Sequence, residues 1–483
     1  MAIKLQRPVL IGGLGLSFSL WLLDSWQDTI AQLGEYSLFS LLAVGGGLWL
    51  LKQNRPKNSN PSVAVVPPNR ETVSKAIAKV EAVITQFSDE AEKYNCVNAA
   101  HQVPTLREKA AQLYVELDRQ EIQLAVTGGK SVGKTTLVEA LKSNWNKQGV
   151  PKTVSILETP ALFTGTGFDK VSLTQAAASD LVLFLTNGDL TDTEFKTVQQ
   201  LQAVNQRVML VFNKQDQYQP DERASILLSL KQRMQNNVVA TAGSPLAIKV
   251  RKHSEDGSFE EWMEQPEADI KQLTLLLSEV LATQGFELVW ATTMRKASVL
   301  QTEAKDLLNS IRKERALPVI EQYQWIAAAA AFANPVPALD ILGTAAINAQ
   351  MVIDLGNIYQ QKFSLEQAKT VAGEMGGLML KLGLVEISSK AIGTVLKSHA
   401  VTFVAGGLVQ GVSAAYLTRL AALSLVEYLQ QQEVSVNSGN KLNLEKLGQV
   451  LQNVFTQNQQ MAVLQGFAKQ GVKRLLPEAE VAA

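Results

Sequence analysis

The chain has 483 residues, of which 46% are hydrophobic and 19% are charged, so it holds enough apolar material for two or three domain cores. Forty-five basic residues balance forty-five acidic ones, which argues against the strong positive charge of a dedicated nucleic-acid binder. The single cysteine rules out an intramolecular disulfide, and the three histidines show no metal-ligand spacing. Composition therefore predicts a multidomain globular chain of a reducing compartment, with no nucleic-acid partner and no His/Cys metal site.

The N-terminus contains two apolar segments without charges, residues 8–23 and 36–51. As helices, each would cover about 24 Å, less than the ~30 Å hydrocarbon core of a bilayer. Basic residues flank the pair on its outer sides, whereas the connection at 24–35 carries only acidic charges, so the positive-inside rule places both outer ends in the cytoplasm. We expect a transmembrane helical hairpin over residues 1–52. A buried hairpin of a soluble core and a secretory signal peptide are the alternatives.

Residues 53–71 are rich in proline and asparagine, which predicts an extended linker. Apolar residues then recur at helical spacing, so a helical region is expected over residues 72–119. The pattern changes at Ile122–Thr127, a short apolar run followed by glycines. Such a run is typical of a buried strand that leads into a loop.

The loop after this strand satisfies the pattern G-x-x-x-x-G-K-[ST], and a helical pattern follows it. Glycines at these positions let backbone N–H groups surround a phosphate at the positive end of the helix. Lys134 is expected to neutralise phosphate charge, and the hydroxyl of Thr135 to bind Mg²⁺. An ordinary glycine turn is the alternative. The expected phosphate-binding residues are Gly128, Gly129, Lys130, Ser131, Val132, Gly133, Lys134, Thr135 and Thr136.

A second polar motif, Asn213-Lys214-Gln215-Asp216, follows an apolar strand pattern at 207–212. Paired with the phosphate-binding loop, it resembles the N-K-x-D guanine-specificity motif of the translation-factor class of GTPases. The resemblance implies that Asp216 accepts hydrogen bonds from guanine N1–H and the 2-amino group, which adenine does not offer in that arrangement. It also implies that Asn213 holds the base loop and that the stem of Lys214 packs on the nucleotide. GTP and GDP, bound with Mg²⁺, are the implied ligands.

The segment Glu158-Thr159-Pro160-Ala161 stands where this family has D-x-x-G. Glu158 is expected to reach the metal ion through water in place of the aspartate, and Ala161 keeps the N–H that would meet a γ-phosphate. Only 22 residues separate Thr135 from Glu158, too few for a full first switch and an edge strand. We therefore expect slow hydrolysis, or hydrolysis that needs a partner or a second copy.

Two further residues, Thr241 and Ala242, follow a strand pattern and would take the place of the family's S-A-K base-contacting loop. The implied catalytic groups are Lys134, Thr135 and Glu158, and the metal ligands among them are Thr135 and Glu158.

Beyond residue 265 the pattern is helical, with helices expected at 270–281 and 286–320. Residues 251–265 before them are expected to be a polar excursion. The Asn-Pro-Val-Pro sequence at 334–337 and the residues after it resemble the YcjF-like domain of unknown function, over roughly residues 300–430. That domain follows Era-like GTPase domains in bacterial and plastid-related proteins. We favour an apolar bundle that abuts or dips into the membrane over helices that span it.

The whole sequence thus resembles a GTPase of the Era-like (TrmE–Era–EngA–YihA–septin), dynamin-related group. The expected fold is an α/β P-loop GTPase domain and an all-α apolar C-terminal domain, preceded by the hairpin. The expected segments are the transmembrane hairpin (1–52), the linker (53–71), a helical region (72–119), the GTPase domain (120–265), a long helical connector (266–325), the YcjF-like helical domain (326–430) and a polar helical tail (431–483).

This resemblance implies a membrane-anchored protein whose GTPase domain lies on the cytoplasmic side of a bacterial or plastid-type membrane. It would hydrolyse GTP slowly and switch a helical domain near the bilayer. The implied partners are the lipid bilayer, a second copy of the chain and a protein that the sequence does not identify. Two other functions stay open: a nucleotide-binding scaffold without turnover, and a channel-like or transport component regulated by a GTPase module.

Overall fold

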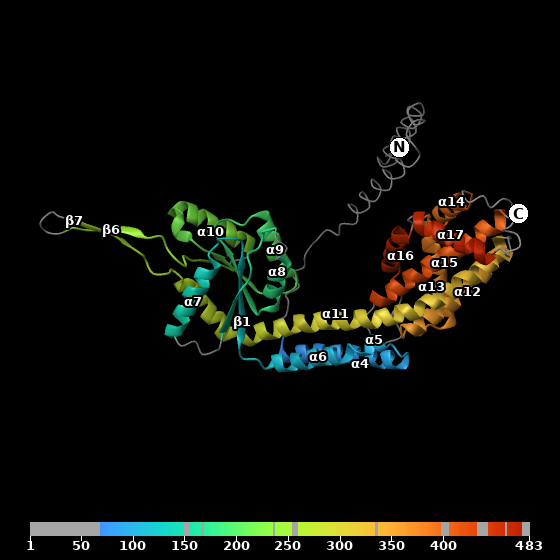
Figure 1. Cartoon of the computed structure of the whole chain (residues 1–483), viewed down its shortest axis with the longest axis horizontal. Coiled ribbons are helices and arrows are strands. Elements are labelled where there is room, and N and C mark those ends of the chain that lie inside the picture. The colour runs from blue at the N-terminus through green and yellow to red at the C-terminus, as the bar shows by residue number, and fades with distance from the viewer. Residues whose placement is uncertain are drawn as a thin grey trace, which may run out of the picture. The chain divides into compact units, whose positions relative to one another are not determined.

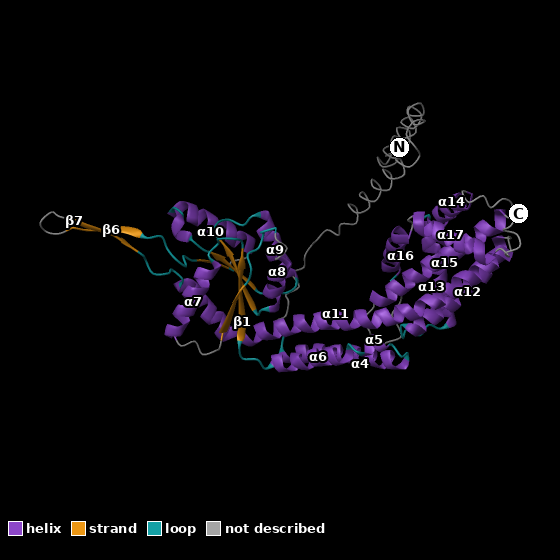
Figure 2. Cartoon of the chain, in the orientation of Figure 1, coloured by secondary structure: helices purple, strands orange, loops and turns teal. Residues whose placement is uncertain are grey.

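The computed structural model describes residues 68–148, 154–165, 169–234, 237–253, 259–333, 337–397, 405–431, 443–458 and 461–475 (Figures 1 and 2). The hairpin expected at 1–52 lies outside the described residues, as does most of the expected linker. The described part of the chain combines a parallel sheet covered by helices with a long helical region, which confirms the α/β and all-α domains predicted from the sequence.

Five parallel strands form the main sheet, in the order β2-β1-β3-β4-β5. The short apolar runs of the sequence become strands whose residues are buried on both faces, as in β3 and β4, because helices cover both sides. The strands are β1 (Ile122–Gly128), β2 (Val154–Glu158), β3 (Leu181–Thr186), β4 (Val208–Phe212) and β5 (Val238–Ala240).

One edge strand of this sheet is β2, which pairs with β1 alone. Leu157 in β2 is 45% exposed, as expected of a side chain at an uncovered sheet edge. No strand lies outside β2 among the described residues. This arrangement agrees with the short spacing between Thr135 and Glu158, which leaves no room for an additional edge strand.

Two separate cores fill the two faces of the sheet. On one face, α7 and the beginning of α11 pack against side chains such as Leu124 and Val126. On the other face, α8, α9 and α10 pack against Val182 and Phe184. The helices are α7 (Lys134–Gln148), α8 (Asp169–Ala178), α9 (Asp192–Ala203), α10 (Pro220–Met234) and the long α11 (Lys271–Ala333), and the short 3-10 helix η1 covers Gln215–Gln217.

Residues 251–265 do not form an irregular excursion. Their described residues form most of an antiparallel ribbon of β6 (Ile248–His253) and β7 (Phe259–Glu264), which Figure 1 shows extending away from the main sheet. Apolar and basic residues alternate at the beginning of β6, but the exposed Trp262 and Met263 of β7 are adjacent, so the sequence shows no period-two pattern there.

The two helices expected at 270–281 and 286–320 are one continuous helix, α11, of 63 residues. Gly285 lies inside it and is buried. A glycine in a helix interior costs about 1 kcal/mol, which the burial of neighbours such as Leu281 and Leu288 outweighs. The separation into two helices was therefore wrong.

The helical region before the sheet forms an antiparallel pair that packs along α11 (Figure 1). Asn69 and Thr72 make a capping box at the beginning of α4, and the apolar stripe at Val73, Ile77 and Val80 is fully buried. The helices are α4 (Arg70–Lys93), the short α5 (Val97–Ala100) and α6 (Val103–Leu117).

The C-terminal helices surround the end of α11 and share one apolar core with it. The residues expected to form a polar helical tail contribute two of these helices, with Leu447, Leu451 and Phe467 buried in that core. The burial of these apolar side chains makes the segment part of the C-terminal domain. The helices are α12 (Pro337–Ile358), α13 (Leu365–Lys381), α14 (Leu384–Lys397), α15 (Ala405–Gln431), α16 (Leu444–Asn458) and α17 (Met461–Leu475).

Two helices of the described residues, Lys271–Ala333 and Gly407–Gln431, are long and apolar enough to cross a membrane. The apolar window of the second is 67% buried within the protein and that of the first 44%. A mostly buried core helix meets the same length and hydropathy criteria, so these helices are weak evidence for a membrane span.

Candidate functional site

The loop between β1 and α7 brings its backbone close to two neighbouring segments. Gly128 has φ +145°, and a Cβ there would lie 2.5 Å from the carbonyl oxygen of Leu185. Gly133 has φ +89°, and a Cβ there would lie 2.4 Å from Nδ2 of Asn213. Glycine is therefore required at both positions, for the backbone angle and for the space.

The side chain of Lys134 folds back over this loop. Its Nζ donates hydrogen bonds to the carbonyl oxygens of Gly129 at 2.7 Å and of Gly128 at 3.1 Å, and the residue is 8% exposed. Burial lowers the pKa of Lys134, while the negative charge of Glu158 opposes this shift. The ammonium group thus lies at the centre of the loop, where phosphate charge would be neutralised.

A hydroxyl and a carboxylate meet beside Lys134. Thr135 Oγ1 donates a hydrogen bond to Oε1 of Glu158 at 2.7 Å. The parallel register, with Val126 opposite Glu158, places the end of β2 next to the phosphate-binding loop. Hydroxyl and carboxylate oxygens are the ligands that Mg²⁺ prefers, so the donor set fits this ion.

The segment after Glu158 is held against the same loop at two points. The backbone N–H of Thr159 donates to the carbonyl of Val126 at 3.0 Å, and that of Leu162 donates to the carbonyl of Gly128 at 3.1 Å. Ala161 lies between these two anchored residues. The backbone of Ala161 is therefore part of a segment that is held against the phosphate-binding loop.

Asn213 joins three loops through one buried side chain. Its Nδ2 donates to the carbonyl of Val132 at 2.9 Å, and its Oδ1 accepts from Thr241 Oγ1 and from the N–H of Gly243, both at 3.1 Å. The residue is 2% exposed. This geometry is a structural reason for asparagine here, because the side chain must both donate and accept.

Asp216 offers one carboxylate oxygen for a ligand. Its Oδ2 accepts a hydrogen bond from the N–H of Leu246 at 2.9 Å. Its Oδ1 is buried and has no hydrogen-bond partner among the described residues. A buried carboxylate oxygen without a partner is costly, so a donor such as guanine N1–H or the 2-amino group fits this position.

The residues expected from the sequence come together at the carboxyl ends of β1, β2, β4 and β5, where parallel α/β sheets bind ligands. Lys130 and Ser131 lie at the exposed rim of the loop. The contacts of Gly243 and Leu246 could not be predicted, because they use backbone N–H groups, which carry no residue-type pattern.

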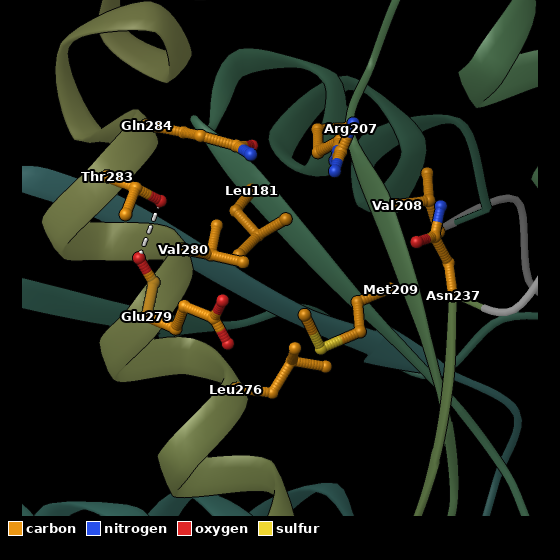
Figure 3. Close-up of a pocket in the computed structure, with 10 residues that line it drawn as sticks. All are labelled: Leu181, Arg207, Val208, Met209, Asn237, Leu276, Glu279, Val280, Thr283 and Gln284. Carbon is orange, nitrogen blue, oxygen red and sulfur yellow. Dashed lines mark hydrogen bonds between the residues drawn. The ribbon is translucent and has the colours of Figure 1, made fainter.

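A cavity of about 200 Å³ lies elsewhere, at the amino end of β4 and against α11 (Figure 3). Figure 3 shows Leu181, Met209 and Leu276 along its floor, with Arg207 and Glu279 on opposite sides. It lies at the ends of the strands opposite the phosphate-binding loop, and it is not part of the nucleotide-type site.

Comparisons with known proteins give one family match. The family described as a domain of unknown function, DUF697, matches residues 295–460. This match begins within α11 and covers most of the C-terminal helical region, where a helical domain of unknown function was expected. No curated protein matches the chain.

Among solved structures, the chain is similar to the LeoA bacterial dynamin GTPase from ETEC, with 12% identity, coverage of 84% of this chain and 98% of that chain, and a TM-score of 0.27. It is also similar to an oligomerised bacterial dynamin pair, described as a mechanism for long-range sensing and tethering of membranes, with 11% identity, coverage of 81% and 79%, and a TM-score of 0.25. Scores this low do not establish a common arrangement of the whole chain.

Proposed function

We propose that this chain is a membrane-associated GTP-binding protein of the Era-like, dynamin-related kind, which binds GTP and GDP with Mg²⁺ and hydrolyses GTP slowly. One observation carries the proposal: Asn213 ties the phosphate-binding loop to the base loop, and beside it Asp216 presents a buried oxygen without a partner. The two halves of a guanine nucleotide site are thereby held together.

Each residue of the site has a separate role in this proposal. The loop from Gly128 to Thr135 holds the phosphates through its backbone N–H groups, and Lys134 neutralises their charge. Thr135 would bind the Mg²⁺ ion through its hydroxyl and Glu158 would reach it through water, and the ion would supply further charge neutralisation. Lys214, Thr241 and Ala242 line the base side, where Asp216 reads the guanine edge.

Slow turnover follows from the segment after Glu158. Leu162 is 1% exposed and belongs to the apolar core against α8 and α9, so its side chain does not orient a water molecule. Ala161 has a Cβ where the family has glycine, which restricts its backbone. Hydrolysis then depends on groups from a partner or from a second copy.

The nucleotide site and the helical domain share the long helix α11. Arg295 in α11 donates from Nη2 to the carbonyl of Ser179 at 2.9 Å and from Nη1 to the carbonyl of Asn205 at 3.0 Å. Ser179 follows α8, which in turn follows the Glu158 segment. A shift of that segment with nucleotide state would therefore act on α11 and on the helical domain.

Membrane association rests on the sequence of residues 1–52. In the proposal this hairpin anchors the chain, with the GTPase domain on the cytoplasmic side of a bacterial or plastid-type membrane. The lipid bilayer, a second copy and an unidentified protein are the proposed partners, and a nucleic acid is not.

Replacing Asp216 by asparagine tests base recognition. Asp216→Asn should lower GTP affinity by about 100-fold, because a carboxylate acceptor for two donors is lost. It should raise affinity for xanthosine triphosphate, whose 2-carbonyl accepts a hydrogen bond from the new amide. Titration with fluorescent nucleotides measures both. Asp221→Asn, an exposed substitution in α10, is the matched control. Lys134→Ala should lower the affinity for both nucleotides.

Unchanged GTP affinity in Asp216→Asn, or equal affinity of the wild-type chain for ATP and GTP, would reject the proposal. Tight GTP binding without turnover, with or without anionic liposomes, would favour the scaffold function, which the altered segment from Glu158 to Ala161 and the short first switch support. Resistance to alkaline carbonate extraction in a chain without residues 1–60 would instead support spanning helices and a channel-like component.

A further inference from the structure

The β6–β7 ribbon is closed at its neck beside the base loop. The backbone of Ala242 and that of Asp269 exchange two hydrogen bonds, Ala242 N–H to Asp269 O at 3.0 Å and Asp269 N–H to Ala242 O at 2.9 Å. The chain therefore leaves the base loop at Ala242, forms the ribbon and returns to the same place at Asp269.

Two loops form the base side of the site: the loop after β4 with Asn213–Asp216, and the loop after β5 with Thr241 and Ala242. The side chain of Asp269 contacts the loop after β4. Its Oδ2 accepts a hydrogen bond from Nε2 of Gln215 at 2.8 Å. The backbone N–H of Gln215 donates to the carbonyl of Thr241 at 3.1 Å. Asp269 thus holds one base loop through its backbone and the other through its carboxylate, directly beside Asp216.

Asp269 is also attached to α11. Ile270 follows it and accepts a hydrogen bond at its carbonyl from the N–H of Thr274 at 2.9 Å. Ile270 is 3% exposed, and Leu273 and Leu277 are fully buried against the main sheet. Movement of Asp269 relative to the sheet therefore requires movement of the first turns of α11.

We propose that Asp269 is a positioning residue for guanine recognition: by holding Gln215 it fixes the carboxylate of Asp216, and it couples occupancy of the base site to the beginning of α11. This inference rests on the proposed function, since it concerns the same nucleotide site. It adds a residue outside the N-K-x-D motif, at the start of the helix that leads into the helical domain.

The test is base discrimination in the full chain in detergent micelles. Inosine triphosphate lacks the 2-amino group, so it can use one of the two hydrogen bonds to Asp216. The wild-type chain should prefer GTP over inosine triphosphate by about tenfold. In Asp269→Ala this ratio should fall by about fivefold, because a displaced Asp216 loses the two-bond geometry. Gln215→Ala should do the same, and the double variant should be no worse than either.

Two matched variants separate positioning from general damage. Asp269→Asn keeps an oxygen that accepts from Gln215, so it should restore most of the discrimination. Glu267→Ala removes a nearby exposed acid and should leave the ratio unchanged. Hydrogen exchange in residues 271–281 should slow when GDP binds to the wild-type chain and should not respond in Asp269→Ala.

A wild-type ratio retained in Asp269→Ala, or additive losses in the double variant, would overturn the inference while leaving the proposed function intact. No preference of the wild-type chain for GTP over ATP would reject the proposed function itself.

Discussion

Two clusters of charged side chains hold α11 at different points, and they are built on different partners. The sheet-side cluster consists of Arg119, Asp180 and Arg295 and lies where α11 passes the main sheet. The bundle-side cluster consists of Glu90, Arg312 and Arg315 and lies between α4, α11 and the turn after α12.

In the sheet-side cluster, backbone groups take part as much as side chains. Asp180 is fully buried, forms a two-point pair with Arg119 at 2.8 and 2.9 Å, and accepts from the N–H of Gln123 at 2.7 Å. Arg295 donates to the carbonyls of Ser179 and Asn205. Each charged group therefore keeps some partners when another is removed.

In the bundle-side cluster, one carboxylate serves three side chains. Glu90 accepts from Arg312 at 2.7 Å, from Gln360 at 3.0 Å and from Arg315 at 3.3 Å. The side chains of Glu90 and Arg312 are 7% and 4% exposed. Loss of Glu90 leaves the buried Arg312 without its carboxylate, so this end of α11 is the more sensitive to a single substitution.

The largest effect is expected from Glu90→Ala. It should lower the free energy of unfolding by about 3–5 kcal/mol, the usual cost of leaving a buried charge uncompensated. Urea unfolding followed by circular dichroism measures this change. The control is Asp118→Ala, which removes the exposed pair with Arg70, whose side chain is 59% exposed, and should cost under about 1 kcal/mol. Equal losses of unfolding free energy in the two variants would show that the buried pair is no more important for stability than the exposed one.

A smaller effect is expected from Arg295→Met. It takes a charged donor from the carbonyls of Ser179 and Asn205, which should cost about 1–3 kcal/mol. Thr292 Oγ1 still lies 3.3 Å from the carbonyl of Ser179 and limits the loss. Hydrogen exchange of β3 and α8 in the same chain measures the local change. A loss as large as that of Glu90→Ala would show that the sheet-side cluster is the more fragile one.

The smallest effect is expected on the pH dependence of the free energy of unfolding in alkali. Its sign differs between Arg295 in the sheet-side cluster and Tyr359 beside the bundle-side cluster. Burial raises the pKa of Tyr359, whose ring lies 5.8 Å from the Arg312 guanidinium, from 10.0 to about 12. Between these values the folded chain binds more protons, so Tyr359 lowers the free energy of unfolding as pH rises. Burial lowers the pKa of Arg295 to about 10, so this residue raises that free energy over the same window.

Tyr359→Phe should therefore reduce the loss of stability between about pH 10 and 12, and Arg295→Met should increase it. Urea midpoints at pH 9, 10 and 11, compared with those of the wild-type chain, measure the slopes. The same slope in both variants would contradict the assignment.

The two nucleotide motifs could be predicted from sequence because each combines a short spacing with a local backbone requirement. Gly133 illustrates this, since its positive φ and its contact with Asn213 admit no other residue. Lys134, Thr135 and Asp216 then lie where parallel strand ends must place them. The metal and catalytic roles assigned to Glu158 remain predictions.

Other features depend on contacts that are distant in sequence. Asp269 and Gln215 are 54 positions apart in the sequence and share one hydrogen bond. Acidic residues before helices are common, so the position of Asp269 before α11 did not distinguish it as a site residue. The continuity of α11 through Gly285 was missed because sequence does not show that the neighbours of this glycine are buried against the sheet. The helices α16 and α17 were expected as a polar helical tail, and their burial in the C-terminal core was missed because their leucines and phenylalanines stand among many glutamines and asparagines.

The continuity of α11 has a mechanical consequence. At 1.5 Å per residue its 63 residues form a rod of about 95 Å. The sheet-side cluster holds this rod at Arg295, so the free lever runs from there to Ala333 and is about 57 Å long. A rotation of about 5° about that point would move the far end by about 5 Å, roughly half a helix diameter.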